Sequence, residues 1–451
     1  MQIFKKHFKN FISNYKDIIE LPSDINFKNI KKISTDTRTL LKNDIFIALK
    51  GENFNGDNFL KDAIKKHAKL CISEKKYKKT ITVKSTSNFL RDFSKYIIEK
   101  NPKIKTIGIT GTNGKTTTKE MVNSIIKQKF RTHCTKGNYN NQIGLPLTIM
   151  EMNSKTEYLI LEMGTNSLGE IEILADIARP QISTITNIGK GHTEKLKNKK
   201  TIFKEKFHIT KRFDKNSTFI FNMDDKIINK KYKDFPYSKE SFGIYSNSSF
   251  KALKINKEYS SYHLKHNKIE TKIKMKINGI GNIYNSLCAA SIASVAGISM
   301  KDIKKGLESY VGIKNRFNII KSKNRNLIIN DTYNANPNSM ANAIEMTNKI
   351  YPSMNKIAIL GDMLELGEIE KNEHVKIGKL LLKNNFKNIY IYGKNLKNYS
   401  DGIKGKQKVE YIKRHKDILK FIDLKKINNT VILVKGSRGS KMENVFDYLK
   451  F

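Results

Sequence analysis

The chain has 451 residues, with 85 lysines and arginines against 42 aspartates and glutamates, so its formal net charge at pH 7 is +43. The length suggests about two to four domains that each bury a core, and the hydrophobic fraction of 38% argues against a disordered chain. The three cysteines, at positions 71, 134 and 288, are far apart without a CxxC pair, which excludes a disulfide framework and a zinc site of the usual spacing and favours a reducing cytosol.

The high positive charge has two interpretations. A basic surface neutralises phosphates, which would fit a nucleic-acid partner. Lysine, asparagine and isoleucine are enriched along the whole chain, however, and the lysines do not form one dense tail. We therefore favour a general compositional bias over a specific nucleic-acid partner, while noting that a basic surface attracts any polyanionic substrate.

The first block spans residues 1–102 and mixes short strands and helices, ending at Asn101-Pro102. Its first twenty residues carry aromatic and aliphatic side chains at helical spacing between lysines: Phe4, Phe8, Phe11, Tyr15 and Ile18. Such a basic amphipathic helix can lie on a membrane surface, but the acidic Asp17 and Glu20 that follow favour a helix that faces a core. The chain has no run of about 18 apolar residues, so we expect no membrane span.

The second block spans residues 103–312 and alternates strand patterns with helix patterns. Strands are expected at residues 104–109, 158–161 and 182–188, and a helix is expected from Thr116. This alternation is typical of a mostly parallel sheet. The lysine-rich stretch from about residue 225 to 275 has a weak pattern, and we interpret it as a partly exposed insertion.

The third block spans residues 313–451 and has the pattern of a doubly wound, Rossmann-like unit. Its expected strands lie at residues 327–329, 357–360, 389–392 and 431–434, with helical patterns such as residues 375–382 between them. The predicted fold class is therefore α/β with three domains. An α/β substrate domain comes first, a central parallel-sheet domain with a phosphate loop follows, and a Rossmann-like domain ends the chain.

A phosphate-binding loop is expected between the first strand of the second block and the helix after it. The residues are Gly111, Thr112, Asn113, Gly114, Lys115, Thr116 and Thr117. Glycines let backbone N–H groups approach phosphate oxygens, and the N-terminus of the helix adds its positive dipole end. Lys115 can reach the β and γ phosphates, and the Thr116 hydroxyl can bind Mg²⁺. The longer eight-residue motif needs a glycine where this chain has Ile109, so the match consists of the GKT core and its context.

Two side chains at strand ends are candidate metal ligands. Glu162 ends an apolar strand beside the loop strand, where a carboxylate is well placed for Mg²⁺, although a solvated strand-end glutamate is an equal alternative. His192 lies at the end of another strand, where a structural histidine is the commoner case.

Taken together, these segments resemble the Mur ligase family. The resemblance covers nearly the whole chain in order. It rests on STDTR from Ser34, TGTNGKTTTKE from Thr110, GNYNNQIGLPLT from Gly137, EMGTN from Glu162, ARPQISTITNIGKGH up to His192, NRFN around Arg316, DTYNANPNSM from Asp331, LGDMLELGE from Leu360 and VKGSRGSKME from Val434.

The resemblance implies an ATP-dependent ligase of peptidoglycan precursor synthesis in the cytoplasm. Its substrates would be ATP, UDP-N-acetylmuramoyl-tripeptide and D-alanyl-D-alanine, and it would act as a monomer without a specific nucleic acid. In this family pattern, residues 1–102 hold the UDP end, residues 103–312 bind ATP, and residues 313–451 complete the ATP site and bind the dipeptide.

The resemblance also assigns roles to individual residues. Lys115 and Thr116 would serve the phosphates and the first of two Mg²⁺ ions, with Glu162 and His192 as metal ligands. Lys206 aligns with a lysine that is carbamylated in the family and would bind the second ion. The remaining assignments are Asn285 and Arg316 to ATP, Asp331 to its ribose, Asn138 and Asn141 to the muramoyl peptide, and Thr37 and Arg38 to the UDP substrate.

Some positions depart from the family pattern, and two other functions stay open. Asn315 replaces a usual glycine, Asp57 a common histidine, and Phe207 and His208 replace small and acidic residues. One alternative function is a related ligase that adds a different amine. The other is a basic P-loop NTPase that binds nucleic acid, although no concentrated basic stripe or aromatic stacking motif is visible.

Overall fold

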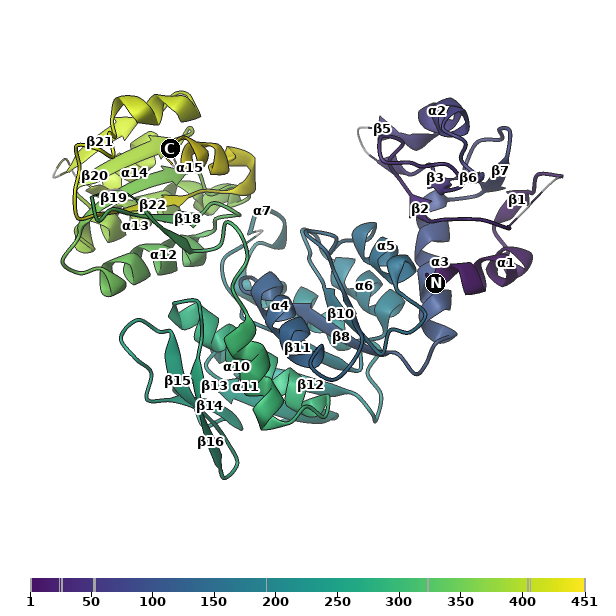
Figure 1. The fold of residues 1–451 in the computed structure, drawn as a ribbon, viewed down its shortest axis with the longest axis horizontal. Helices are drawn as coiled ribbons and strands as arrows, with labels where there is room; N and C mark the ends of the chain where they lie inside the picture. The colour runs from purple at the N-terminus through teal and green to yellow at the C-terminus, as the bar shows by residue number, and fades with distance from the viewer. Residues whose placement is uncertain are drawn as a thin grey trace.

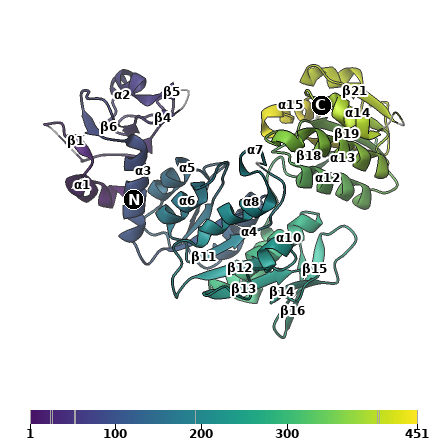
Figure 2. The same ribbon diagram turned by 180° about the vertical axis from the view of Figure 1, so that it is seen from behind.

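The computed structural model describes residues 2–23, 25, 27–51, 54–191, 193–322, 324–403, 405 and 407–449. The chain folds into three lobes, and the first and third lobes lie at opposite ends of the middle lobe (Figures 1 and 2). No helix among these residues is long and apolar enough to cross a membrane.

The first lobe is built on a five-stranded sheet in the order β1-β7-β6-β3-β2. Its strands are β1 (Ile18–Glu20), β2 (Ile33–Ser34), β3 (Ile45–Ile47), β6 (Leu70–Ser73) and β7 (Thr80–Val83), and β4 (Lys50–Gly51) pairs separately with β5 (Phe54–Asn55). The helices are α1 (Phe4–Asn14), η1 (Gly56–Phe59), α2 (Leu60–Lys65) and α3 (Thr86–Glu99). Only β1 runs antiparallel to its neighbour in the larger sheet.

The N-terminal helix α1 faces a core. Phe4, Phe8 and Phe11 are buried, and the ring of Phe11 packs against Phe89 and Phe93 of α3. This burial agrees with a core-facing helix, because the apolar stripe has no face left for a membrane. The helix ends before Tyr15, so it is shorter than the aromatic spacing indicates.

The first and middle lobes share one hydrophobic core. Side chains of α1 and α3 join a continuous buried cluster with the middle-lobe helices α5 (Gly144–Glu151) and α6 (Glu170–Ala178). Two ion pairs cross the same boundary, Lys95–Asp176 and Arg179–Glu99, each at 2.7 Å. The shared core and these ion pairs fix the first lobe on the middle lobe.

The middle lobe contains a nine-stranded sheet in the order β16-β15-β14-β13-β12-β11-β8-β10-β9. The strands are β8 (Lys105–Thr110), β9 (Thr132–Cys134), β10 (Tyr158–Glu162), β11 (Ile182–Ile185), β12 (Thr218–Asn222), β13 (Ser238–Gly243), β14 (Phe250–Leu253), β15 (Ser261–His266) and β16 (Ile269–Lys274). All neighbours from β9 to β14 run parallel, and β14, β15 and β16 are antiparallel. The predicted parallel central sheet is therefore confirmed.

Helices cover both faces of this sheet because its strands are apolar on both sides. Leu159 and Leu161 join the core with α5 and α6, whereas Ile160, which points to the opposite face, joins a second core with α4 (Lys115–Ile126). The other helices of the lobe are α7 (Thr193–Leu196), α8 (Lys199–Phe207), η2 (His208–Thr210), α9 (Lys226–Asn229), α10 (Ile280–Val295) and α11 (Met300–Ser309).

The interpretation of residues 225–275 as an insertion is wrong. These residues form α9 and the strands β13 to β16, which extend the central sheet to its edge. In β14 and β15 buried side chains mostly alternate with partly exposed ones, and lysines occupy several of the outward positions. The high lysine content of the segment made this strand pattern hard to recognise in the sequence.

The third lobe is a six-stranded sheet in the order β17-β18-β22-β19-β20-β21, flanked by helices (Figure 1). The strands are β17 (Asn318–Lys321), β18 (Leu327–Asp331), β19 (Asn355–Gly361), β20 (Asn388–Tyr392), β21 (Lys408–Tyr411) and β22 (Thr430–Lys435). The helices are α12 (Pro337–Ile350), η3 (Gly367–Ile369), α13 (Glu370–Lys383), α14 (Leu396–Ile403), η4 (His415–Lys420), η5 (Arg438–Ser440) and α15 (Glu443–Leu449). The four expected strands are present and parallel, and β17 and β21, whose sequences are weakly apolar, were not predicted.

We expect Phe93→Ala to lower the free energy of unfolding by about 3–5 kcal/mol, because it removes a fully buried ring from the core that joins two lobes. Chemical denaturation followed by circular dichroism measures this change. The matched control is Phe54→Ala, whose ring is 53% exposed and whose loss should change stability by about 0.5 kcal/mol or less. Equal effects of the two substitutions would contradict the shared core.

Candidate active site

The turn between β8 and α4 depends on two glycines. Gly111 has φ 146° and Gly114 has φ 82°. A Cβ at Gly111 would lie 1.9 Å from Thr186 Oγ1, and one at Gly114 would lie 2.3 Å from Asn285 Oδ1. The chain therefore turns sharply from the strand into α4, whose first backbone N–H groups lack helical partners and form an anion-binding end.

Lys115 folds back over this turn. Its Nζ donates to the carbonyl oxygens of Gly111 at 2.9 Å and Thr112 at 3.3 Å. Burial lowers the pKa of Lys115, the nearby Arg316 lowers it further, and Glu162 opposes the shift. The ammonium group thus has neutral acceptors and an unfavourable cationic neighbour, so an anion in this place would stabilise its charged form.

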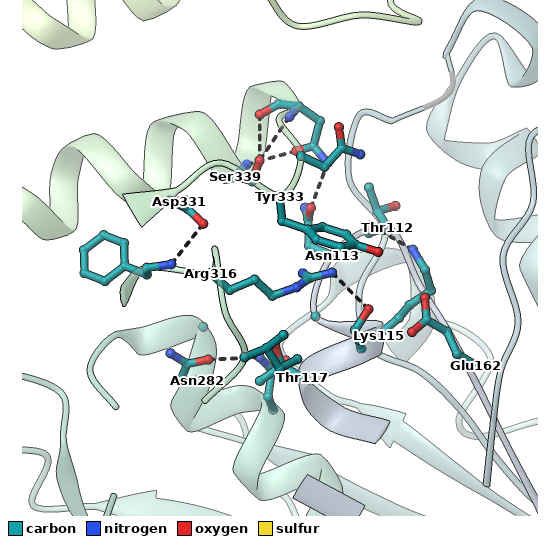
Figure 3. A pocket seen from close by; sticks show the side chains of 18 of the residues that line it. Thr112, Asn113, Lys115, Thr117, Glu162, Asn282, Arg316, Asp331, Tyr333 and Ser339 are labelled. Carbon is teal, nitrogen blue, oxygen red and sulfur yellow. Dashed lines mark hydrogen bonds between the residues drawn. The ribbon is translucent and has the colours of Figure 1, made fainter. Parts of the chain in front are cut away.

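A cavity of about 610 Å³ lies between the loop and the third lobe, with side chains of both lobes turned into it (Figure 3). It brings together most of the residues that the sequence predicts for the site, namely Thr112, Asn113, Gly114, Lys115, Thr116, Thr117, Asn138, Asn141, Glu162, Asn285, Arg316 and Asp331. Gly111, Lys206, Thr37 and Arg38 do not line it. The candidate ligand His192 lies outside the described residues.

Glu162 offers a free carboxylate oxygen to the site. The residue is 3% exposed, and its position at the end of β10 is fixed by pairing with Ile109 of β8. Asn140 Nδ2 donates to Glu162 Oε1 at 2.8 Å, whereas Oε2 is buried without a hydrogen-bond partner. A buried, unpaired carboxylate oxygen is costly unless a cation binds it, so this atom fits a metal ligand. Among the described residues no group of three or more histidine, cysteine or acidic side chains is arranged to hold a metal ion by itself.

Lys206 is buried close to Lys115. It lies on α8 with 2% of its surface exposed. Burial, and then repulsion from Lys115, lower the pKa of Lys206 to about 7, and Glu205 opposes this shift. Glu205 is itself engaged at the start of α6, where it accepts from the backbone nitrogens of Gly169 at 2.7 Å and Ile171 at 2.8 Å. Near neutral pH a large fraction of Lys206 is therefore an uncharged amine.

The third lobe contacts the loop through Arg316 and Asn336. Arg316 Nη2 donates to Thr116 Oγ1 at 2.9 Å, and its guanidinium lies 4.1 Å from the centre of the Tyr333 ring (Figure 3). Asn336, which caps α12, donates to Asn113 Oδ1 at 2.7 Å. Both contacts place third-lobe side chains directly over the phosphate loop.

Asp331 and Asn285 are held by neighbouring side chains. Asp331 Oδ2 pairs with Lys435 Nζ at 2.6 Å, and its Oδ1 accepts from the backbone nitrogen of Phe317 at 3.1 Å. Asn285 on α10 accepts a hydrogen bond from Thr118 Oγ1 at 3.3 Å. Asp331 and Asn285 thus border the cavity from the third lobe and from the middle lobe respectively.

The residues predicted for the muramoyl and UDP ends lie in two different places. Asn138 and Asn141 line the cavity, although the side-chain oxygen of Asn141 also accepts from the backbone nitrogen of Gly144, the first residue of α5, at 2.8 Å. Thr37 and Arg38 lie in the first lobe. Arg38 is exposed and is paired with Asp36, whose pKa it lowers to about 2 through side-chain and backbone hydrogen bonds.

Four residues with clear contacts in the site received no role from the sequence. They are Asn140, Tyr333, Asn336 and Lys435, and all four lie within or next to motifs that carry the resemblance. The motifs mark these segments, but only the tertiary contacts tell which side chain in each segment points at the loop.

We expect Lys206→Met to raise the free energy of unfolding by about 1–3 kcal/mol at pH 6, because it removes a buried cation while it keeps most of the packing. The folded-state pKa of about 7 lies below that of an unfolded lysine, so protonation penalises the folded state fully below pH 7. The penalty fades as the pH rises from 7 to 10. Urea unfolding of both proteins in CO₂-free buffer measures the difference in the free energy of unfolding. A stability gain of Lys206→Met that grows with pH would contradict a buried amine with a lowered pKa.

Two family models match the chain. The Mur ligase middle domain matches residues 109–293, and the Mur ligase, glutamate ligase domain matches residues 315–438. Two curated relatives are both named UDP-N-acetylmuramoyl-tripeptide–D-alanyl-D-alanine ligase. The one from Bacillus subtilis is 32% identical over 92% of this chain and 92% of its own, and the one from Buchnera aphidicola is 35% identical over 93% and 92%.

Solved structures agree with these relatives. MurF from Acinetobacter baumannii superposes with a TM-score of 0.88 at 29% identity, covering 96% of this chain and 95% of its own. MurF ligase from Thermotoga maritima, solved in complex with ADP, has a TM-score of 0.81 at 26% identity, covering 93% and 97%. The three-lobed arrangement is therefore that of these ligases.

Proposed function

Since the chain belongs to the Mur ligase family, we propose that it is an ATP-dependent ligase that joins D-alanyl-D-alanine to UDP-N-acetylmuramoyl-tripeptide. One observation supports this most: the phosphate loop and Glu162 of the middle lobe share a single cavity with Arg316 and Asp331 of the third lobe. The activity is the one that the names of the two relatives state for those proteins.

The three lobes divide the substrates in this proposal. Residues 1–102 would hold the UDP end, with the partly exposed Thr37 and the exposed Arg38 on the first lobe as contacts. Residues 103–312 bind ATP and place Asn138 and Asn141 beside the muramoyl peptide. Residues 313–451 complete the ATP site and bind the dipeptide.

The loop and the third lobe would bind ATP together. The turn from Gly111 to Thr117 and the side chain of Lys115 would hold the phosphates, because both present donors to the cavity. Asn285 and Arg316 would contact the nucleotide. Asp331 would accept from the ribose hydroxyls, with Lys435 holding its carboxylate in place.

The described residues fit a first Mg²⁺ ion at Thr116 and Glu162. Glu162 Oε2 is a buried oxygen without a hydrogen-bond partner, and Thr116, near the start of α4, lines the same cavity as Glu162. We propose His192 and a carbamylated Lys206 as ligands of a second ion. When bound, these ions would neutralise charge on the phosphoryl group during transfer.

The surroundings of Lys206 support the proposed carbamylation. The uncharged Nζ would attack the carbon of CO₂, form an N–C bond and release a proton, which leaves a negatively charged carbamate. Lys115 would attract the carbamate anion, whereas it repels the protonated form of the amine. The family resemblance and the burial of the amine both support this modification.

The proposed reaction has two chemical steps, and residues of the chain stabilise the charge that develops in the first. An oxygen of the tripeptide carboxylate attacks the γ-phosphorus of ATP, the bond to the ADP oxygen breaks, and an acyl phosphate forms. Lys115 and Arg316 stabilise the charge that spreads over the phosphoryl oxygens. The amine of D-alanyl-D-alanine then attacks the acyl carbon, loses a proton and displaces phosphate.

Exclusion of water protects the acyl phosphate, which hydrolyses readily. The third lobe contacts the middle lobe around the loop through Arg316–Thr116 and Asn336–Asn113, and Lys190 Nζ lies 2.8 Å from Glu373 Oε1. These contacts would close the cavity while both substrates are held together. We propose that a monomer performs the reaction, in the cytoplasm where its ATP is available.

The activity can be tested directly by product mass spectrometry. With ATP, Mg²⁺, D-alanyl-D-alanine and a UDP-muramoyl tripeptide ending in lysine or diaminopimelate, we expect ADP, phosphate and the matching pentapeptide. Lys115→Ala should reduce turnover by about a thousandfold or more, because it removes the cation of the phosphate site. The matched control is Lys127→Ala, at the exposed end of the same helix, which should retain full activity.

Two outcomes of this assay would reject the proposal. If another amine were incorporated instead of D-alanyl-D-alanine, the chain would be a related ligase of different specificity. If only DNA or RNA stimulated ATP hydrolysis, a nucleic-acid-dependent NTPase would replace it.

The carbamate can be detected without turnover. We expect a carbamate signal in the ¹³C NMR spectrum of the protein in ¹³C-bicarbonate at pH 8, where the Lys206 amine is largely uncharged. The signal should be absent from Lys206→Met and present in Lys204→Met, a neighbouring position on α8. A signal that persists in Lys206→Met would place the carbamate elsewhere.

A further inference from the structure

The linker between α11 and β17 has an unusual backbone. Of residues 310–317, Gly312 has φ 89°, Asn315 has φ 66° and Phe317 has φ 50°. Left-handed conformations are unfavourable for residues other than glycine and persist where surrounding contacts hold them. Asparagine tolerates this region better than most residues, so Asn315 suits its position. Arg316 lies between the two residues with this backbone.

Asn315 is tied to the sheet of the third lobe at two points. Its Oδ1 accepts from Asn330 Nδ2 at 3.0 Å, and its carbonyl oxygen accepts from Tyr333 N at 3.0 Å. Asn330 is 2% exposed, and its own Oδ1 accepts from Thr332 Oγ1 at 2.7 Å. The backbone nitrogen of Thr332 donates to the same oxygen at 3.3 Å, and because a backbone N–H can only donate, the amide nitrogen of Asn330 must face Asn315.

Further contacts hold the backbone on both sides of Arg316. Arg316 N donates to Asn318 Oδ1, and Phe317 N donates to Asp331 Oδ1, each at 3.1 Å. From this support the guanidinium extends over the Tyr333 ring to Thr116 in the middle lobe (Figure 3). The end of β18 and the turn after it, residues 330–333, thus hold the linker and also stack against the side chain.

We propose that Asn315 is a positioning residue for Arg316. Its side-chain oxygen, held by Asn330, locks the left-handed linker so that Arg316 leaves the backbone in the direction of the phosphate loop. This inference rests on the proposed function, in which Arg316 meets the transferring phosphoryl group. Asn315 itself does not reach the reacting atoms.

Preorganisation is the physical reason for this arrangement. A long arginine side chain has many rotamers, and a fixed starting direction together with the Tyr333 stack removes most of them before the substrate binds. Loss of the Asn315 contact would let the linker relax without unfolding the lobe. The transition state would then lose more stabilisation than the bound nucleotide, because Arg316 matters most where charge develops.

The test uses the full chain with three substitutions. Asn315→Gly keeps the left-handed backbone and removes the acceptor, Asn315→Asp keeps an acceptor, and Asn330→Ala removes the donor. For Asn315→Gly we expect kcat for pentapeptide synthesis to fall about tenfold, with the Kd for ADP within about twofold and Tm within about 2 °C of the unmodified protein. Asn315→Asp should stay within about threefold of the unmodified kcat, because the contact with Asn330 is kept.

The double variant separates positioning from independent damage. If Asn315 and Asn330 act as one contact, Asn315→Gly combined with Asn330→Ala should have a kcat within about twofold of Asn315→Gly alone. The inference would be overturned if the losses of kcat in the two single variants multiplied in the double variant. It would also be overturned if Asn315→Asp lost as much kcat as Asn315→Gly, or if the affinity for ADP fell together with kcat. Unmodified protein that makes no pentapeptide would instead refute the proposed function, so the two failures are distinguishable.

Discussion

A group of basic side chains gathered around the phosphate loop is the constraint on which this site depends. Burial and then the nearby Arg316 lower the pKa of Lys115, and burial and then Lys115 lower the pKa of Lys206. Glu162 is the acidic side chain that opposes the shift at Lys115, and one of its oxygens has no hydrogen-bond partner. An anion that enters the cavity would relieve the repulsion between the basic side chains, and a cation beside Glu162 would bind its free oxygen. A metal–nucleotide complex would supply both the anion and the cation.

The cores of the molecule explain how this charge is supported. The first and middle lobes share one continuous apolar core, and ion pairs along α3 reinforce it, so the first lobe is packed firmly on the lobe that carries the phosphate loop. The third lobe has cores of its own on the two faces of its sheet. Its contacts with the loop include the polar pairs Arg316–Thr116 and Asn336–Asn113. Polar pairs of this kind can exchange partners with a bound substrate at little cost, which a shared apolar core cannot do.

The linker before β17 connects the middle lobe to the third lobe. Its left-handed residues are held by side chains of the third lobe, while Arg316 reaches across to the middle lobe. The position of the Arg316 guanidinium therefore depends on the left-handed backbone, on the hydrogen-bonded asparagines and on the aromatic stack. The same end of β18 supplies Asp331, so the positions of the two third-lobe side chains assigned to the nucleotide depend on each other.

The sequence by itself determined the seven strands predicted in the second and third blocks, the glycine-flanked loop with Lys115 and Thr116, and the family. These features depend on short-range patterns, because strand alternation, helical spacing and turn glycines can each be recognised within a segment of about ten residues. Only the tertiary structure decided that Asn140 holds Glu162, that Lys206 is buried beside Lys115, and that β13 to β16 complete the central sheet. Arg316 meets Thr116 across 200 positions, and Asn336 meets Asn113 across 223. Such contacts follow from how the sheets and lobes pack, which no local pattern of residues encodes.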